Sequence, residues 1–147
     1  MTIRRANDAE LEIINDTIPQ LFKESITTTC VLTEEAMRAM SQRLKAQGAT
    51  YYVLVENGQF KGFMLLDQVE DIFSQQVYGF IYELFVFNSY RRQGVAQKLI
   101  DFAKIFFKEQ GVDEIRLNVF AENNAKLLYE KVGFYDSQIT MKMDLEK

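Results

Sequence analysis

The stretch that decides the fold runs from Val86 to Ile100 and reads VFNSYRRQGVAQKLI. It joins an apolar, strand-like segment to an amphipathic, helix-like one, and Gly94 lies where the second segment begins. The N-terminus of a helix exposes unpaired backbone N–H groups and a partial positive charge, which suit phosphate binding. Two interpretations are open from these residues alone. Either the turn binds an anion, or Gly94 eases a tight turn and the arginines are solvated.

The spacing of apolar residues around this turn predicts alternating strands and helices. In chain order we expect a strand at 2–5, a helix from 7, a helix from 33 to 48, a hairpin at 51–66, a strand at 77–87, a helix from 93 to 111, a strand at 114–120, a short helix from 123 to 133 and a last strand at 139–145. This order predicts one α/β (α+β) domain over residues 1–147, with a mixed sheet that is antiparallel at the hairpin.

Four local signals refine that prediction. Asn7 starts the first helix, and Glu10 three residues later completes a capping-box-like pattern. Asn57-Gly58 favours a two-residue type I′ turn inside the hairpin. Residues 67–76 read as a polar loop. Pro19, the only proline, is expected to kink or split the first helix.

The composition excludes several kinds of site. The 147 residues contain no histidine and one cysteine, so a Ser-His-Asp or Cys-His nucleophile in its usual form is excluded. A structural zinc site lacks its ligands, and we predict no metal. Cys30 has no basic partner nearby in the sequence, so we interpret it as a buried or idle thiol rather than a reactive one.

Charge and hydropathy limit the partners. A formal net charge of −4 argues against a dedicated nucleic-acid binder. The N-terminus has no apolar signal region and no apolar run approaches about 20 residues, so we expect a cytoplasmic protein with no membrane partner. Neither the dinucleotide fingerprint G-x-G-x-x-G nor the P-loop motif occurs, which disfavours a nucleotide hydrolase.

Two stretches, ELFVFNSYRRQGVAQKLI and then IRLNVFAENNAKLLYEKVGF, carry a resemblance to a known family. RRQGVA matches the signature R/Q-x-x-G-x-G/A, and A-x-x-L-Y-E-K-x-G-F follows it along the chain. With both motifs the chain resembles the GNAT superfamily of N-acetyltransferases, closely from Phe80 to Phe134 and elsewhere in element order. The resemblance implies a mostly antiparallel central sheet with a β-bulge or splay between two adjacent strands, about four flanking helices, and acetyl-CoA as cosubstrate.

The resemblance also implies where the cofactor lies. The pantetheine arm is expected along the backbone of Leu84, Phe85 and Val86. The pyrophosphate is expected on the N–H groups of the following turn, Arg92, Gln93, Gly94, Val95, Ala96 and Gln97, with the side chains of Arg91 and Arg92 adding positive charge. Asn118, Asn123 and Asn124 are implied to reach the cofactor from the next strand and helix. Glu122 occupies the position where the family often has asparagine, which leaves open that Asn123 only caps its helix.

Two residues are candidates for catalysis. An amine with a pKa of about 10 must lose a proton before it attacks. Glu83 is the candidate base, directly or through water, with a structural carboxylate or ammonium anchor as the alternative. Tyr129 matches the family's acid tyrosine and is the candidate proton donor to the coenzyme thiolate, with a packing aromatic as the alternative. Backbone N–H groups near Phe85 and Val86 are expected to polarise the acetyl carbonyl.

The sequence therefore predicts transfer of an acetyl group from acetyl-CoA to a primary amine of a small molecule or peptide, by direct attack in a ternary complex. The alternative is a catalytically silent acyl-CoA-binding sensor or interaction module. The acceptor is not chosen by the fold. Several acidic and aromatic side chains are candidates for an acceptor site, and the alternative is that they belong to a solvated loop or to the core. They are Asp67, Glu70, Asp71, Tyr51, Tyr52, Phe73, Tyr78 and Tyr82. The apolar last strand suggests a homodimer interface.

Overall fold

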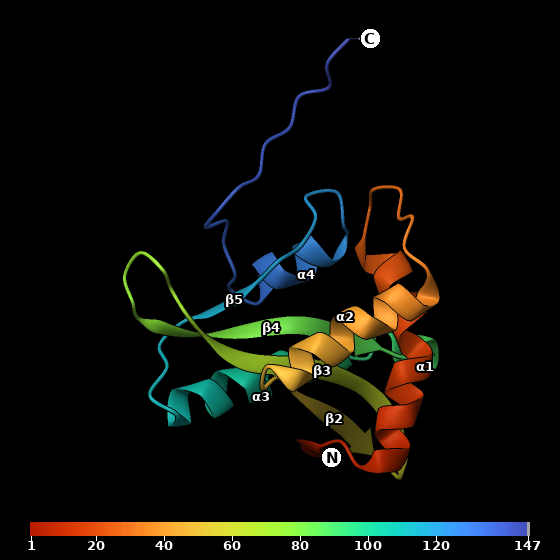
Figure 1. Ribbon diagram of the computed structural model, residues 1–147. Helices are drawn as coiled ribbons and strands as arrows, with labels where there is room; N and C mark the ends of the chain where they lie inside the picture. Colours follow the sequence, from red (N-terminus) through yellow and green to blue (C-terminus); the bar gives the residue numbers. More distant parts are fainter. Residues whose placement is uncertain (147) are drawn as a thin grey trace.

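The computed structural model describes residues 1–146 (Figure 1). Its elements follow in the order β1 (Thr2–Arg5), α1 (Asp8–Ser25), α2 (Glu34–Ala46), β2 (Thr50–Glu56), β3 (Gln59–Glu70), β4 (Val77–Val86), the 3₁₀ turn η1 (Asn88–Tyr90), α3 (Val95–Glu109), β5 (Ile115–Leu117) and α4 (Ala125–Lys131).

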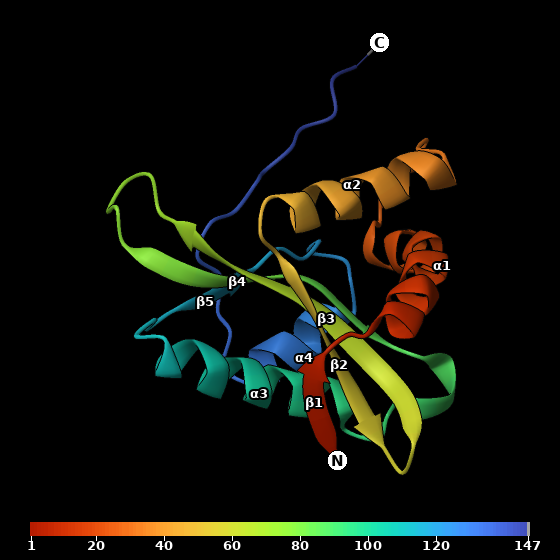
Figure 2. The same cartoon turned by 60° about the horizontal axis from the view of Figure 1, so that its bottom comes forward.

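The five strands form one sheet in the order β1-β2-β3-β4-β5. Strands β1 to β4 are antiparallel neighbours, and β5 alone runs parallel to its neighbour β4. Helices α1 and α2 lie on one face of the sheet and α3 lies on the other (Figure 2). The predicted mixed, mostly antiparallel sheet with four flanking helices is confirmed.

Each face of the sheet carries its own apolar core. The cluster under α1 and α2 includes Ile14 and Met37, packed against Phe63 and Leu65 of β3. The cluster under α3 contains Leu99 and Phe107 together with the alternate residues of the same strands. The sheet is thus buried on both sides, which explains why its central strands read as apolar runs.

The local signals at the chain turns form as predicted. The Asn7 side chain accepts a hydrogen bond from the Glu10 N–H at 2.8 Å, and the Glu10 carboxylate accepts one from the Asn7 N–H at 2.9 Å, completing a capping box. Asn57 and Gly58 have φ values of 54° and 74°, as a type I′ turn requires, and the flanking residues Glu56 and Gln59 pair across it.

Pro19 does not split α1, contrary to one of the two outcomes we expected. The helix runs without interruption through this buried proline. Proline has no N–H to donate to the carbonyl four residues earlier, that of Asn15. Nε of Arg38 in α2 donates to that carbonyl oxygen at 3.0 Å, so the hydrogen bond lost inside α1 is replaced from the neighbouring helix.

A β-bulge in the middle of β4 produces the splay. Leu65 pairs with Glu83, whereas the next residue, Leu66, pairs with Ile81, so Tyr82 is the extra residue. Beyond this point β4 loses its other neighbour, because β5 pairs only with Gly79 to Ile81. The last part of β4 therefore presents a free backbone edge where β5 has turned away.

Three predicted boundaries are wrong. Residues 67–70 belong to β3 rather than to a loop, because they pair with the start of β4. The strand expected at 114–120 is limited to Ile115–Leu117. Residues 139–145 form no strand: Ile139, Met141, Met143 and Leu145 are 68–88% exposed and pair with nothing among the described residues. An alternating pattern specifies a strand only where a sheet edge receives it. The homodimer expected there stays a prediction.

Candidate active site

The turn before α3 presents a row of free backbone donors. The residues from Arg92 to Gln97 precede or form the first turn of α3, and within residues 1–146 neither a side chain nor a carbonyl accepts a hydrogen bond from their N–H groups. The chain curls there because Arg92 and Gly94 have φ values of 62° and 79°. A Cβ on Gly94 would meet nothing within 4 Å, so the space in front of the turn is open. Such a row of donors suits an oxyanion.

The two arginines of the turn have different environments. Arg91 turns back toward the protein: its guanidinium lies 2.7 Å from a carboxylate oxygen of Glu24, donates to the Val86 carbonyl at 2.8 Å and stacks on Phe85. Arg92 is exposed and forms no ion pair with any residue from 1 to 146. Arg92 is therefore the available cation beside the free N–H groups, while Arg91 ties the turn to α1.

Gly62 holds the turn against β4, a role that the sequence did not suggest. A Cβ on Gly62 would lie 2.7 Å from the Phe85 carbonyl oxygen and 3.2 Å from Cγ1 of Val95. Only glycine allows β3, the end of β4 and the first turn of α3 to approach this closely. The end of β4 consequently lies close to the start of α3, with Phe85 and Val95 both beside Gly62.

Glu83 lies under α2, with both of its carboxylate oxygens bonded. The Ser41 hydroxyl donates to Oε2 at 2.6 Å, and the Tyr51 hydroxyl donates to Oε1 at 2.5 Å. Burial raises the pKa of Glu83 above its usual range, and the two hydroxyl donors partly oppose that rise. Ser41 had not been predicted. Its signal was a serine on the buried stripe of α2, between Met37 and Leu44.

Tyr129 lies on α4 and is partly buried. Its ring packs edge-to-face against Phe134 at 6.0 Å, and its hydroxyl bonds to no residue among 1–146. Burial raises the pKa of the Tyr129 phenol, so the group stays protonated at neutral pH. The position therefore combines the packing role with a free proton donor.

The asparagines differ from one another. Asn123 accepts a hydrogen bond from the Ala125 N–H at 2.9 Å and donates to the Ser25 carbonyl at 3.3 Å, so its side chain joins the start of α4 to the end of α1. The N-cap residue of α4 is Asn124, whose side chain makes no cap hydrogen bond. The side chains of Asn118 and Asn124 form no hydrogen bond with the described part of the chain. The side chain of Asn123 is thus engaged within the protein, and the other two side chains are available.

The acidic and aromatic residues considered for an acceptor site are only partly gathered. Asp71 is occupied, since Arg116 lies 2.7 Å from its Oδ2 and the Phe73 N–H donates to its Oδ1 at 2.8 Å. The exposed Phe73 belongs to the loop between β3 and β4. Tyr78 and Tyr82 remain half-buried on β4, and only Tyr82 is next to Glu83 along the strand.

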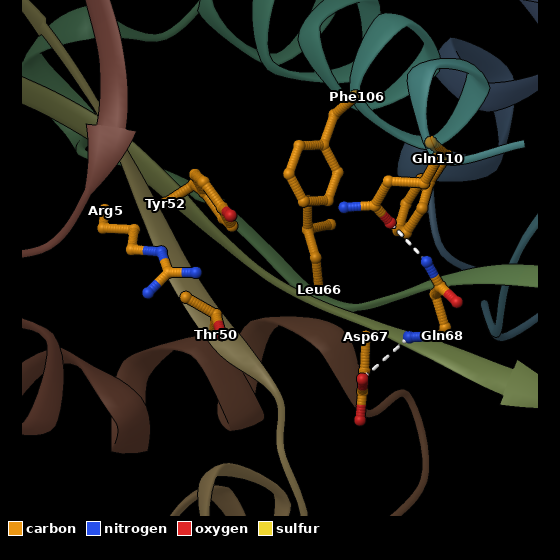
Figure 3. Close-up of a pocket in the computed structure, with 9 residues that line it drawn as sticks. Arg5, Thr50, Tyr52, Leu66, Asp67, Gln68, Phe106 and Gln110 are labelled. Carbon is orange, nitrogen blue, oxygen red and sulfur yellow. Dashed lines mark hydrogen bonds between the residues drawn. The ribbon is translucent and has the colours of Figure 1, made fainter.

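A second hollow lies at the other end of α3. This open pocket of about 280 Å³ is bounded by Tyr52, Phe106 and a hydrogen bond between Gln68 and Gln110, with Arg5 and Asp67 at its rim (Figure 3). A 15-residue helix is about 22 Å long, so the pocket is remote from the free donors at the start of α3. It plays no part in the arrangement around β4.

Comparison with known proteins identifies this arrangement. The family model described as an acetyltransferase (GNAT) domain matches residues 18–144. The chain belongs to the GNAT acetyltransferase family. The residues matched include the splayed strand β4, the turn before α3 and the helix of Tyr129, so the resemblance seen in the sequence is confirmed.

Individual GNAT relatives match at low identity. The chain is 30% identical over 86 residues to a ribosomal protein bS18-alanine N-acetyltransferase of Haemophilus influenzae, a match that spans 58% of this chain and about half (55%) of that relative. It is 26% identical to YdgE, an uncharacterized N-acetyltransferase of Bacillus subtilis, over 98% of both chains.

Solved structures share the GNAT fold over nearly the whole chain. An acetyl transferase from Pyrococcus furiosus has a TM-score of 0.77 at 20% identity and covers 98% of this chain and 99% of its own. The aminoglycoside N-acetyltransferase AAC(6')-Iy in complex with CoA has a TM-score of 0.73 at 20% identity, covering 99% and 95%. Within residues 1–146, no helix has the length and hydropathy needed to cross a bilayer.

Proposed function

We propose that the protein transfers an acetyl group from acetyl-CoA to a primary amine of a small molecule or peptide, by direct attack in a ternary complex. The observation that carries the proposal is the juxtaposition of a free β4 edge with the unpaired N–H groups from Arg92 to Gln97. An extended arm that contains amide groups can pair with the free β4 edge, and a diphosphate suits the unpaired N–H groups. Pantetheine pyrophosphate carries both groups.

Acetyl-CoA fits these residues in the following way. The diphosphate would be held by the N–H groups of Gln93, Gly94, Val95, Ala96 and Gln97, with Arg92 as counter-charge. The pantetheine amides would pair with the edge of Leu84, Phe85 and Val86. Asn118 and Asn124 are free to contact the cofactor, and Arg91 would act by holding the turn in place. The CoA complex of the related AAC(6')-Iy and an acetyl-CoA complex of a Clostridium acetobutylicum relative support this cosubstrate.

The chemistry then requires two proton transfers. The acceptor ammonium gives a proton to Glu83 through water, since the carboxylate is only 6% exposed. The free amine attacks the acetyl carbon while N–H groups near Phe85 and Val86 stabilise the oxyanion. The C–S bond breaks and the sulfur takes a proton from Tyr129. The nitrogen releases its remaining extra proton to solvent, and the Tyr129 phenolate regains a proton from solvent. No acetyl group is attached to the protein at any stage.

Two glycines provide a matched test of the cofactor site. Gly94 and Gly111 lie at opposite ends of α3, have φ values of 79° and 78°, and each has open space where a Cβ would be. Gly94→Trp and Gly111→Trp therefore introduce the same backbone strain, but only the first fills the proposed diphosphate site. Acetyl-CoA at 100 times its dissociation constant should stabilise the wild-type fold by about 2.7 kcal/mol. We expect this stabilisation to survive in Gly111→Trp and to vanish in Gly94→Trp; retention in both would refute the site.

Direct transfer has a separate test. After turnover with radiolabelled acetyl-CoA and a panel of spermidine, lysine and kanamycin, the label should appear on an amine and none should remain on the denatured protein. Label that stays on the protein would indicate an acyl-enzyme.

The occupied oxygens of Glu83 favour one alternative, a silent acyl-CoA-binding module in which this carboxylate is structural. Measuring release of the CoA thiol distinguishes the acetyltransferase from the silent binding module. Amine-dependent release of CoA supports the enzyme, whereas tight binding of acetyl-CoA without release on any amine supports the module.

A further inference from the structure

Three polar side chains from three different elements meet inside the core below α2. Ser41 of α2, Tyr51 of β2 and Glu83 of β4 are 2%, 4% and 6% exposed. The two hydroxyls approach different oxygens of the carboxylate, at 2.6 Å and 2.5 Å. Every donor in the group has an acceptor, and no buried side-chain polar atom among residues 1–146 lacks a partner.

Stability does not explain this group. A carboxylate buried in an apolar core loses its hydration, and apolar residues of similar volume serve a core at least as well. Glu83 pairs with Leu65 of β3 and lies on the face of the sheet that carries the apolar cluster under α1 and α2, which includes Ile14 and Met37. Among residues 1–146 the one titratable group bonded to the carboxylate is Tyr51, and no cation lies against it.

The direction of the two hydrogen bonds matters. Both hydroxyls donate, so both stabilise the ionised carboxylate rather than the neutral acid. Each carboxylate oxygen has two lone pairs and uses one on its hydroxyl, which leaves one on each oxygen for a further donor.

We propose that Ser41 and Tyr51 are positioning residues for Glu83, which clamp its carboxylate in one orientation and keep it ionised, ready to take the proton of the acceptor ammonium. This inference rests on the proposed function of Glu83 as the base. The nitrogen gives its proton to a bridging water as the N–H bond breaks, that water passes a proton to a carboxylate oxygen as the O–H bond forms, and Glu83 returns the proton to solvent after the amide has left. The hydroxyls rotate to suit either state of the acid.

The clamp links the base to the helical layer above the sheet. Because Ser41 belongs to α2, any displacement of α2 away from the sheet removes one of the two donors. Tyr51, by contrast, is fixed by its edge-to-face contact with Phe63 at 5.7 Å.

The neighbouring tyrosine supplies the control. Tyr52 is also buried, but it points to the other face of the sheet, where its ring packs on Phe106, and its hydroxyl makes no hydrogen bond within residues 1–146. Tyr51→Phe and Tyr52→Phe are the same chemical change on adjacent residues of β2, and only the first removes a donor from Glu83. Ser41→Ala removes the other donor, and Ser41→Thr restores a hydroxyl there.

The decisive measurement is the titration of the Glu83 carboxyl carbon by NMR of the ¹³C-glutamate-labelled, acetyl-CoA-bound protein, with Glu83→Gln to assign the signal. Loss of one hydrogen bond to a charged group should move the titration midpoint upward by about one to two pH units. We expect this shift in Ser41→Ala and Tyr51→Phe, its reversal in Ser41→Thr and none in Tyr52→Phe. With the amine of the panel that turns over fastest, the acid limb of kcat/KM should move with the midpoint.

The outcomes separate this inference from the proposed function. A midpoint that does not move in either variant overturns the clamp, whatever the activity. A midpoint that moves while the acid limb of kcat/KM stays fixed also overturns it, because Glu83 is then not the base. If the midpoints move but wild type releases no thiol with any amine, the proposed enzyme fails, and with it the positioning role.

Discussion

Gly62→Ala tests how the diphosphate-binding turn is held in place. Gly62 pairs with Val86, and an added Cβ would lie 2.7 Å from the Phe85 carbonyl oxygen, closer than real Cβ contacts come. The obstructing atom belongs to the backbone, so a rotamer change cannot relieve the contact. A second contact, 3.2 Å from Cγ1 of Val95, lies on the first turn of α3. The strand β3 must move away from β4 or from the start of α3.

The expected magnitude follows from these contacts. Adding a methyl group to a well-packed region costs about 1–3 kcal/mol. In a domain of about 150 residues this corresponds to a fall in Tm of about 3–10 °C. The Phe85 carbonyl and the Val95 side chain both border the proposed cofactor site. We therefore expect the binding free energy of acetyl-CoA to weaken by about 1.4 kcal/mol, which is a tenfold loss of affinity.

Gly58→Ala is the matched control on the same hairpin. Its φ is 74° and nothing lies within 4 Å of the added Cβ, so the substitution introduces backbone strain of about 1–2 kcal/mol and no contact. Urea denaturation should show similar losses in the two variants, and calorimetric titration with acetyl-CoA should show an affinity loss in Gly62→Ala alone. Unchanged affinity in Gly62→Ala, or equal loss in both, would refute the reasoning.

Three further predictions concern other parts of the chain. Tyr129→Phe keeps the aromatic packing but removes the proton donor, so steady-state kinetics should show kcat for thiol release falling about 100-fold at an unchanged KM for acetyl-CoA; a change below threefold would contradict the acid role. Arg38→Met strands the Asn15 carbonyl and should cost about 1 kcal/mol by urea titration, but almost nothing in a Pro19→Ala background, where a helix N–H returns to that carbonyl; absence of this coupling would exclude the rescue. Removal of residues 138–147 should change the free energy of unfolding by less than about 0.5 kcal/mol, because the side chains of residues 138–146 are exposed, and a larger loss in the same assay would show that the segment packs.

What the sequence predicted well was encoded locally. The capping box at Asn7, the Asn57-Gly58 turn and the Gly94 start of α3 each depend on a few adjacent residues, and all three form. The proposed diphosphate site belongs to this class, because its N–H groups come from consecutive residues. A reader of the sequence could therefore locate it from a single stretch.

The features that could not be predicted from the sequence depend on contacts between residues far apart in the chain. Ser41 and Tyr51 reach Glu83 across separations of 42 and 32 residues, and no local pattern signals such a meeting. The close approach at Gly62 is of the same kind. The alternating apolar residues at 139–145 mislead for the converse reason: periodicity states which face would be buried, but it does not provide the sheet edge that buries it.

The bulge at Tyr82 joins the two halves of the proposed site. In a regular strand Ile81 and Glu83, two residues apart, would share a face. Here Ile81 packs under α3, whereas Glu83 bonds to Ser41 under α2, because the extra residue reverses the alternation. The same residue marks the point beyond which β4 no longer pairs with β5. One inserted residue thus opens the backbone edge for the cofactor and turns the carboxylate to the opposite face, so the proposed base and the proposed cofactor site are established by a single irregularity of the sheet.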